Sequence, residues 1–335
     1  MKRNLVLLLI VSITIFTACN DSKKDKRLKT DVNNAEVVDV KIHRYEKVLF
    51  EMNTDQIKET LRKNKQEYSF FLGGNIEDTS NILRIYGFVT DPTIREVYDD
   101  VNKKYPKLDF LEKELGGALT RYLHFMPGKR VPKVFTYHSA MDYENRIIFL
   151  DSVLCIAPDL YLGKDYKFYP QMRIPKYITA RLDSQYIVPD CMKSIAAYNL
   201  TLPPAGSSSL LDIMIYQGKK LYFANITLPE TSEETLIGYS KEQLEWCKQN
   251  EANLWAFFLQ NKLLFEKDFY RIKSFINEGP TTQGFQNSPG RLGEWIGWQI
   301  VKKFMEKNSD ITVSQLFSMT NGQDLLNRSG YRPQK

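Results

Sequence analysis

The spacing of hydrophobic residues changes twice along this chain, and the two changes predict its layout. Between residues 54 and 125, apolar positions recur every three or four residues, as in helices that bury one face. Short β-branched or apolar runs separated by turn residues follow, and helical spacing then returns from residue 175 to the end. The order helices, small sheet, helices predicts an α+β fold in which helices dominate.

The individual elements follow from the same pattern. Helices are expected over 54–71, from Pro92 after Asp91, and over 108–125. Strands are expected over 37–43, 131–138, 146–150 and 155–162. The remaining helices are predicted over 175–182, 189–198, 209–223, 241–265, 289–307 and 312–326.

The first eighteen residues have the pattern of an export signal. Lys2 and Arg3 precede an apolar run over 5–18 that is shorter than the roughly 20 residues a membrane-spanning helix needs. The sequence FTAC that ends at Cys19 resembles the lipobox of bacterial lipoproteins. We therefore expect cleavage before Cys19 and attachment to the membrane through a lipid on that cysteine. The alternative is an ordinary secretory signal followed by an incidental cysteine.

Composition then divides the mature chain. Residues 19–36 are polar and contain no aromatic side chain, which predicts a flexible tether after the lipidated cysteine. Residues 37–335 show no repeat and no low-complexity linker, which predicts a single domain. Removing residues 1–18 lowers the formal net charge from +6 to +4, with 44 basic and 40 acidic residues. Because the basic residues are not gathered into one patch, we expect no nucleic-acid partner.

The residue types limit the possible chemistry. A hydrophobic share of 43% excludes a disordered chain, and four cysteines are too few for a disulfide scaffold. Besides Cys19 there are Cys155, Cys191 and Cys247, an odd number whose spacing selects no pair, so buried thiols are the default expectation.

Recognisable catalytic motifs are missing from the sequence. No GxxxxGK[ST], GxGxxG after a strand or GxSxG is present, so we expect no nucleotide cofactor and no nucleophile elbow. The three histidines, His43, His124 and His138, lie far apart, and no HExxH occurs, so no metal is expected. A hydrolase that uses His138 with a nearby carboxylate remains open as an alternative.

One distinctive helix is expected over 209–223. Ser209 and Asp212 have the spacing of a capping box. Gly218 lies on the apolar face, where it permits close approach by a neighbouring element, and Gln217 lies beside that face. A packed amphipathic helix explains the pattern, and a Gln217 side chain that faces a cleft is the alternative.

A second distinctive helix is expected to begin with Ser288 as N-cap and Pro289 as its first residue. Three glycines at spacings of three and four then alternate with two tryptophans, namely Gly290, Gly293, Gly297, Trp295 and Trp298. This spacing predicts close backbone packing, because each glycine costs the helix up to about 1 kcal/mol relative to alanine. The alternative is an anion held at the helix start with Arg291 alongside.

Several segments together resemble the gliding-motility lipoprotein GldB family of Bacteroidota. They are the lipobox, VPKVFTYHSAMDYENRIIFL, LLDIMIYQGKKLYF, the run IGYS–EQLEWC–NEANLW, and SPGRLGEWIGWQIVKKFM. The resemblance covers nearly the whole mature chain. It implies an envelope lipoprotein linked to gliding motility and its protein machinery. The candidate cleft or family-motif residues are Gln217, Gly218, Arg291, Gly293, Trp295, Gly297 and Trp298.

The family is in turn similar to predicted gluzincin-type zinc peptidases. In those enzymes an HExxH helix follows a sheet, and a later helix supplies a ligand Glu before Gly. Here the segment 189–200, PDCMKSIAAYNL, contains no His and no Glu, and Gln217 stands before Gly218. Catalytic zinc typically needs three protein ligands and a base. The resemblance therefore implies a degenerate, gluzincin-like architecture, a pseudo-enzyme that binds without cutting.

Together these observations predict a non-catalytic lipoprotein that binds or scaffolds an envelope protein. We expect it at the outer membrane facing the periplasm, because the residues after Cys19 are basic and lack an acidic tract. The alternatives are a peptidase or glycan-directed hydrolase without HExxH, and a glycan- or peptide-binding cleft lined by some of the 19 Tyr and 19 Phe residues.

Overall fold

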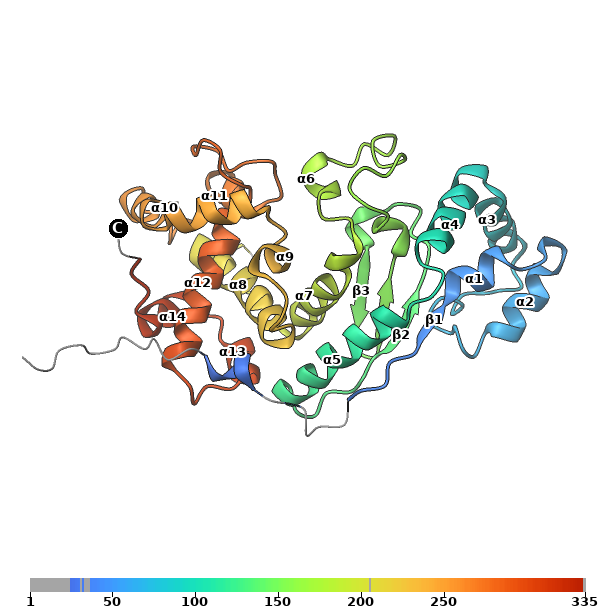
Figure 1. Ribbon diagram of the computed structural model, residues 1–335, viewed down its shortest axis with the longest axis horizontal. Coiled ribbons are helices and arrows are strands. Elements are labelled where there is room, and N and C mark those ends of the chain that lie inside the picture. Colours follow the sequence, from blue (N-terminus) through green and yellow to red (C-terminus); the bar gives the residue numbers. More distant parts are fainter. Residues whose placement is uncertain (1–24, 31, 33–36, 205, 334–335) are drawn as a thin grey trace, which may run out of the picture.

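The computed structural model describes residues 25–30, 32, 37–204 and 206–333. The described part of the chain is elongated, with three groups of elements in a row (Figure 1). The group at one end holds α1 (Tyr45–Phe50), α2 (Ile57–Asn64), α3 (Thr79–Thr90) and α4 (Pro92–Lys104). The middle group holds β1 (Ile42–Arg44), β2 (Lys133–Thr136), β3 (Ile147–Leu150), β4 (Val153–Ile156), α5 (Asp109–Phe125), α6 (Lys176–Thr179) and α7 (Ile187–Asn199).

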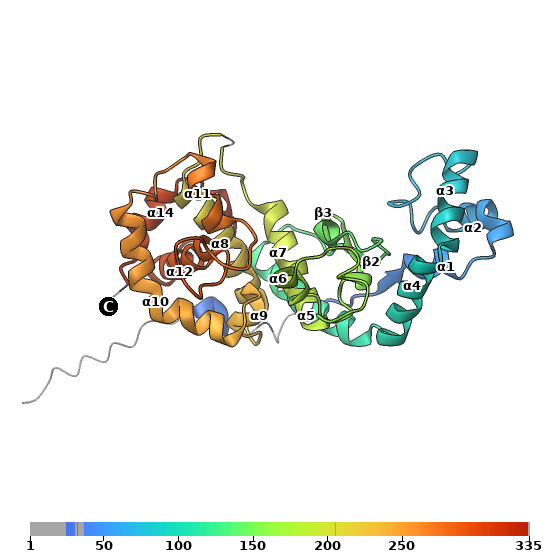
Figure 2. The ribbon, with the colours of Figure 1, turned by 90° about the horizontal axis from the view of Figure 1, so that it is seen from above.

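The group at the other end is entirely helical where it is described, as the view from above shows (Figure 2). It holds α8 (Leu210–Thr227), α9 (Glu233–Ile237), α10 (Lys241–Gln260), α11 (Phe269–Ile276), α12 (Leu292–Lys307), α13 (Val313–Ser318) and α14 (Gly322–Ser329). The described residues also form short 3-10 helices: η1 (Lys26–Lys29), η2 (Thr54–Gln56), η3 (Tyr143–Asn145), η4 (Pro158–Leu160) and η5 (Ser184–Tyr186). The predicted α+β class with a small sheet is confirmed.

The sheet has the strand order β1-β2-β4-β3. β1, β2 and β4 are parallel to one another, whereas β3 is an antiparallel edge strand that pairs Ile147 with Ile156 of β4. Alternate side chains point to opposite faces. Val134 and Leu154 join the main core with α5 and α7, and Phe135 and Cys155 join a second core with α1–α4. Four strands form as predicted, but the first forms only at the end of its predicted range. The fourth, β4, overlaps its predicted range of 155–162 only at residues 155 and 156, because Pro158–Leu160 form a 3-10 helix.

α8 and α12 form the centre of the helical end and make the most extensive contact in the molecule. A Cβ atom on Gly297 would lie only 1.8 Å from the carbonyl oxygen of Met214 on α8, and a Cβ on Gly293 would lie 3.1 Å from the Met214 side chain. The capping box of Ser209 and Asp212 also forms at the start of α8. The prediction of close backbone packing at these glycines is confirmed.

Several predicted boundaries are wrong for local reasons. α12 begins at Leu292, after Arg291 in a left-handed conformation (φ 58°), rather than at Pro289. The hydroxyl of Ser288 instead accepts a hydrogen bond from the Thr282 N–H at 3.1 Å, which ties down the preceding loop. The predicted helix over 312–326 is two helices, because the Asn321 side chain caps α14.

Four helices, α1, α3, α9 and α11, have no counterpart in the sequence prediction. α3 buries only Val89 fully, and α11 buries only Ile272 and Phe275. α1, α9 and α11 contain no more than eight residues each, too few for an apolar repeat to be recognised over several turns.

The N-terminal segment differs most from its prediction. Residues 25–30, expected to belong to a flexible tether, form η1 and pack against the helical end of the molecule. The Asp25 side chain is buried and accepts a hydrogen bond from the Tyr222 hydroxyl of α8. The predicted signal peptide and the predicted lipidation site, Cys19, lie outside the described residues. Within the described residues, no helix combines the length and apolar character needed to cross a membrane.

Candidate functional site

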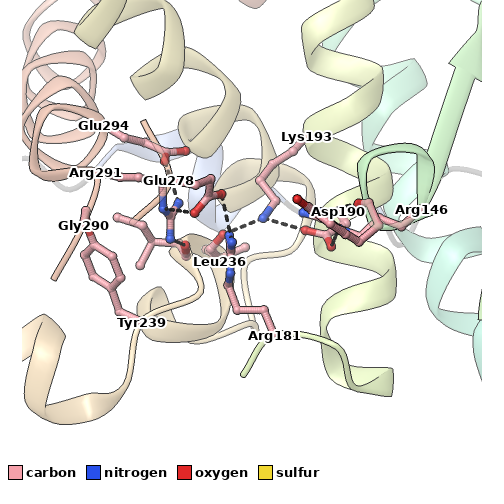
Figure 3. A network of polar contacts seen from close by, with 12 residues as sticks. Arg146, Arg181, Asp190, Lys193, Leu236, Tyr239, Glu278, Gly290, Arg291 and Glu294 are labelled. Carbon is pink, nitrogen blue, oxygen red and sulfur yellow. Dashed lines mark hydrogen bonds and ion pairs between the residues drawn. The ribbon is translucent and has the colours of Figure 1, made fainter. Parts of the chain in front are cut away.

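A cavity of about 320 Å³ lies between α7, α8, the start of α12 and the beginning of β3. We call it the charged cleft, because charged side chains dominate its lining (Figure 3). The cations are Arg146, Arg181, Lys193, Lys220 and Arg291, and the carboxylates are Glu144, Asp190, Glu278 and Glu294.

Asp190 of α7 organises the side of the cleft nearest the sheet. Its Oδ2 accepts hydrogen bonds from Arg146 Nε and the Tyr161 hydroxyl, both at 2.9 Å, and its Oδ1 lies 2.8 Å from Lys193 Nζ. Burial by itself would raise the pKa of Asp190, but Lys193 and Arg146 outweigh it and hold this pKa well below its usual range. Asp190 is therefore an ionised structural anchor at neutral pH.

Arg291 organises the opposite side. Its Nη1 donates to Glu294 at 2.6 Å, its Nη2 donates to the Ile237 carbonyl at 2.9 Å, and its Nε lies 3.1 Å from Glu278. Burial lowers the pKa of Arg291, but Glu294 and Glu278 outweigh that effect and raise it. The left-handed backbone at Arg291 directs this side chain across the start of α12, so its role is to bind the loops around the cleft together.

Arg181 shares Glu278 with Arg291. Arg181 Nη2 lies 2.9 Å from Glu278 Oε1, and this buried nitrogen makes no hydrogen bond of normal geometry with any described residue. The stem of Arg181 packs over Gly238, where a Cβ atom would lie 2.3 Å from Arg181 Cδ. Gly238 adopts φ 76°, so glycine serves both the backbone conformation and the close approach.

A second cavity of about 270 Å³ shares Glu278 and Arg291 with the charged cleft. It is lined by the aromatic side chains Tyr177, Tyr186 and Tyr239. Tyr239 stacks under the Arg291 guanidinium at 5.3 Å and donates a hydrogen bond to the Gly290 carbonyl at 2.6 Å. The ion pairs of Glu278 therefore form a partition between a charged and an aromatic cavity.

The residues predicted from sequence divide into two groups. Gln217 and Arg291 line the charged cleft. The others pack the helices: Gly218, Gly293 and Gly297 lie in close contacts, and Trp295 and Trp298 are 1% and 0% exposed. Both tryptophans are therefore core residues and not cleft residues, since an amphipathic repeat cannot distinguish a core face from a cleft wall.

Most cleft residues were not predicted. Glu294, three positions after Arg291, has a readable helical spacing, and Asp190 stands out as a charge in the largely apolar helix 187–192. Arg181 and Glu278 come from loops that tertiary packing brings together, and no local pattern in the sequence marks them.

His138 lies outside the cleft. Its side chain is 2% exposed and packs against the rings of Phe50 and Phe88, with centroids 5.4 and 5.7 Å away. Nδ1 accepts a hydrogen bond from the Ala140 N–H at 3.0 Å and lies 3.7 Å from Asp159. Within the described residues, no three His, Cys, Asp or Glu side chains gather as metal ligands would.

Comparison with known proteins places the chain in a family. The gliding motility protein GldB family, a family of lipoproteins, matches residues 25–333. None of the curated proteins and none of the solved structures matches the chain. The matched region begins at Asp25, the first residue of the docked N-terminal segment, and runs through the cleft to the end of the described chain. This chain belongs to the gliding motility protein GldB family.

Proposed function

We propose that this gliding-motility lipoprotein is non-catalytic and binds a protein of the gliding machinery through the charged cleft. The observation that carries the proposal is the state of the ionisable groups in the cleft. Asp190, the most buried cleft carboxylate, is committed to Arg146 and Lys193, and its pKa is held well below its usual range. A carboxylate with so low a pKa is a poor general base, so the cleft is better suited to binding than to proton transfer.

In the resemblance to gluzincin-type peptidases, two segments correspond to the zinc-ligand helices, namely 189–200 and Gln217 before Gly218. Their residues support the same proposal. The cleft is lined there by Asp190, Lys193, Ser194 and Ala197 of α7 and by Gln217 of α8. A serine hydroxyl and an amide are weak ligands for zinc, which prefers Cys, His, Asp and Glu. These lining residues are those expected of a degenerate, gluzincin-like cleft that binds a ligand without cleaving it.

For the location, we propose a single domain attached by a lipid on Cys19 to the outer membrane and facing the periplasm. The lipoprotein family and the signal-like residues 1–18 support attachment to the envelope. The residues that follow Cys19 are basic and lack an acidic tract, which supports an orientation towards the periplasm.

Crosslinking and capture from native membranes test the binding role. We expect the wild-type protein to recover a specific partner and Ala197→Trp, which fills the cleft, to lose it. Tyr198→Trp is the matched control, because Tyr198 is 49% exposed on the next position of α7 and does not line the cleft. Equal recovery by both variants, or no specific partner for the wild type, would contradict the proposal.

Metal analysis tests the non-catalytic role. We expect no stoichiometric zinc in protein purified without chelators, and one zinc per chain would overturn the pseudo-enzyme proposal. The hydrolase alternative makes a separate prediction, that His138→Ala abolishes a peptidase or glycan-hydrolase activity. The burial of His138 among aromatic rings favours a packing role for this residue.

A further inference from the structure

One cation of the charged cleft has no partner among the described residues. Lys220 of α8 forms no ion pair and no hydrogen bond within this part of the chain, and its Nζ lies 5.6 Å from the Tyr216 ring centroid. The other cleft cations share carboxylates: Arg146 and Lys193 share Asp190, and Arg181 and Arg291 share Glu278. The positive charge of the cleft is therefore not fully compensated.

We propose that the charged cleft binds an oxyanion, the carboxylate or phosphate group of a ligand, with Lys220 as its main contact. The inference deepens the proposed binding function and rests on it. Arg181 lines the same cavity and is 7% exposed, and its Nη2 is ion-paired to Glu278 at 2.9 Å outside hydrogen-bond geometry. An oxyanion supplies the acceptor that Lys220 lacks and adds a second anionic partner for Arg181.

The electrostatic surroundings of Lys220 agree with this proposal. Burial is the largest effect on the pKa of Lys220 and lowers it; Glu294 raises this pKa, whereas the neighbouring Lys193 and Arg291 lower it. A bound anion offsets both burial and like-charge repulsion, so it favours the protonated ammonium. The cavity volume of about 320 Å³ lies at the small end of ligand sites, which suits one anionic group better than a large ligand.

Calorimetric titration of the detergent-purified lipoprotein at constant ionic strength tests the site. The probes are succinate and inorganic phosphate, with succinamide as the neutral control. We expect one or both anions to bind, and Lys220→Gln to weaken binding by about tenfold or more. Lys220→Arg keeps the charge and should retain most of the affinity. Lys58 of α2 is exposed and forms no ion pair with the residues that the structure describes, so Lys58→Gln should bind like the wild type.

The outcomes separate the possibilities. Binding of succinate alone assigns a carboxylate ligand, and binding of phosphate alone assigns a phosphate ligand. No binding of either anion, or equal affinity in Lys220→Gln, overturns the inference. If neither anion binds but Ala197→Trp still abolishes partner capture, the oxyanion site is wrong and the proposed function stands.

The attachment of η1 to the domain bears on how the protein is oriented at the membrane. Arg27 of η1 donates to the carbonyls of Met305, Ser309 and Ile311 at 3.1, 3.2 and 2.6 Å. Arg121 of α5 donates back to the carbonyl of Arg27 at 2.8 Å. These hydrogen bonds and the buried Asp25 attach η1 firmly to the domain, so the chain is anchored there.

Asp25 follows Cys19 by only six positions, with five residues between them. Even fully extended, a chain of this length spans no more than about 20 Å. A lipid on Cys19 therefore keeps the docking site of η1 near the bilayer. On α8, Tyr222 contacts Asp25 and Lys220 lines the cleft, and two residues correspond to about 200° around a helix. The docked turn and the cleft thus lie on opposite sides of α8.

We infer that the face carrying η1 is turned towards the membrane and that the charged cleft opens away from it. In Figure 1, η1 lies beside α13 at the lower edge, whereas α6 and α11, which precede Arg181 and Glu278, lie at the upper edge. This orientation leaves the cleft accessible to a partner in the aqueous compartment.

Fluorescence quenching tests the orientation on the full lipoprotein in vesicles of phosphatidylethanolamine and phosphatidylglycerol that contain spin-labelled lipid. One label is attached at Asp310→Cys, between Ser309 and Ile311, and a second at Glu144→Cys on the exposed rim of the cleft. We expect strong quenching at residue 310 and weak quenching at residue 144. The double variant Arg27→Gln, Tyr222→Phe undocks η1 and should reduce the difference. Equal quenching at both positions, or an unchanged difference after undocking, overturns the inference.

Discussion

Gly218 of α8 and Gly297 of α12 meet backbone to backbone. A Cβ atom on Gly218 would lie 2.3 Å from the carbonyl carbon of Gly297, closer than real Cβ contacts allow. The contact fixes the separation of the two helices whose faces and ends carry Gln217, Lys220 and Arg291. Packing at these glycines and the shape of the charged cleft are therefore linked.

Gly297→Ala should unfold the protein more easily. Because the new methyl group would lie 1.8 Å from the Met214 carbonyl oxygen, we expect a loss of about 3 kcal/mol or more in the free energy of unfolding. Gly117→Ala on α5 is the control, since a Cβ there meets nothing within 4 Å and should stabilise by about 0.5–1 kcal/mol. Urea denaturation measures both. A neutral Gly297→Ala would contradict the close contact.

Lys219 gives a pH-dependent prediction in the alkaline range. Its side chain is buried, and burial lowers its pKa to about 8 from the ordinary 10.5. Between these values the unfolded chain holds a proton that the folded protein has released, so stability should rise with pH by up to about 1.4 kcal/mol per unit. Lys219→Met should remove this rise.

The measurement compares urea unfolding of both proteins at pH 7.5 and 9.5. Tyrosines titrate mainly above this window, and the difference between wild type and Lys219→Met isolates the lysine. The exposed Lys58→Met should keep the wild-type slope. Parallel pH profiles for wild type and Lys219→Met would show that the pKa of Lys219 is not lowered in the folded protein.

Asp190 gives a pH-dependent prediction of the same sign in the acidic range, where stability should fall as the pH falls. Its pKa is held well below the ordinary value, so its stabilising contribution is complete above about pH 4 and is lost as the pH falls towards the folded-state pKa. Asp190→Asn leaves Arg146 and Lys193 without their shared carboxylate, and we expect a loss of about 3–5 kcal/mol at pH 7. The variant should also lose less further stability in acid than the wild type. An unchanged acid profile would contradict this role.

The three remaining cysteines should be inert in the native protein. Cys155, Cys191 and Cys247 are buried free thiols, and burial raises the pKa of Cys155 and of Cys247 to about 12. Because the thiolate is the reactive form, a thiol reagent such as Ellman's should label none of them before unfolding and all three in denaturant. Rapid native labelling of any one would show that its burial is incomplete.

Cys19→Ala tests the lipid anchor directly. Without its acylated cysteine the protein should leave the membrane fraction, because no described helix could replace the anchor. Cell fractionation followed by immunoblotting measures the shift, with Cys155→Ala as the control that should stay membrane-bound. Retention of Cys19→Ala in the membrane would contradict the lipoprotein signal.

The sequence by itself determined those features that depend on local spacing. Helix periodicity predicted α5, α7, α8 and α10, and the Asp91–Pro92 pair marked the start of α4, because caps and apolar repeats act within a few residues. The place of Gly218 on an apolar face, and the glycine spacing around Gly297, predicted close packing at both residues, since a tight contact compensates for the helix cost of glycine. The family resemblance also came from contiguous segments.

Only the tertiary structure decided which charges share a cavity. Arg146, Arg181 and Glu278 come from three loops or strand ends, and long-range packing alone brings them to Asp190 and Arg291. The tertiary structure also turned residues 25–30 from an expected tether into a docked turn, because the carbonyl groups that bind Arg27 come from residues 305–311. Local propensity cannot report such contacts, since their partners lie almost 300 residues away along the chain.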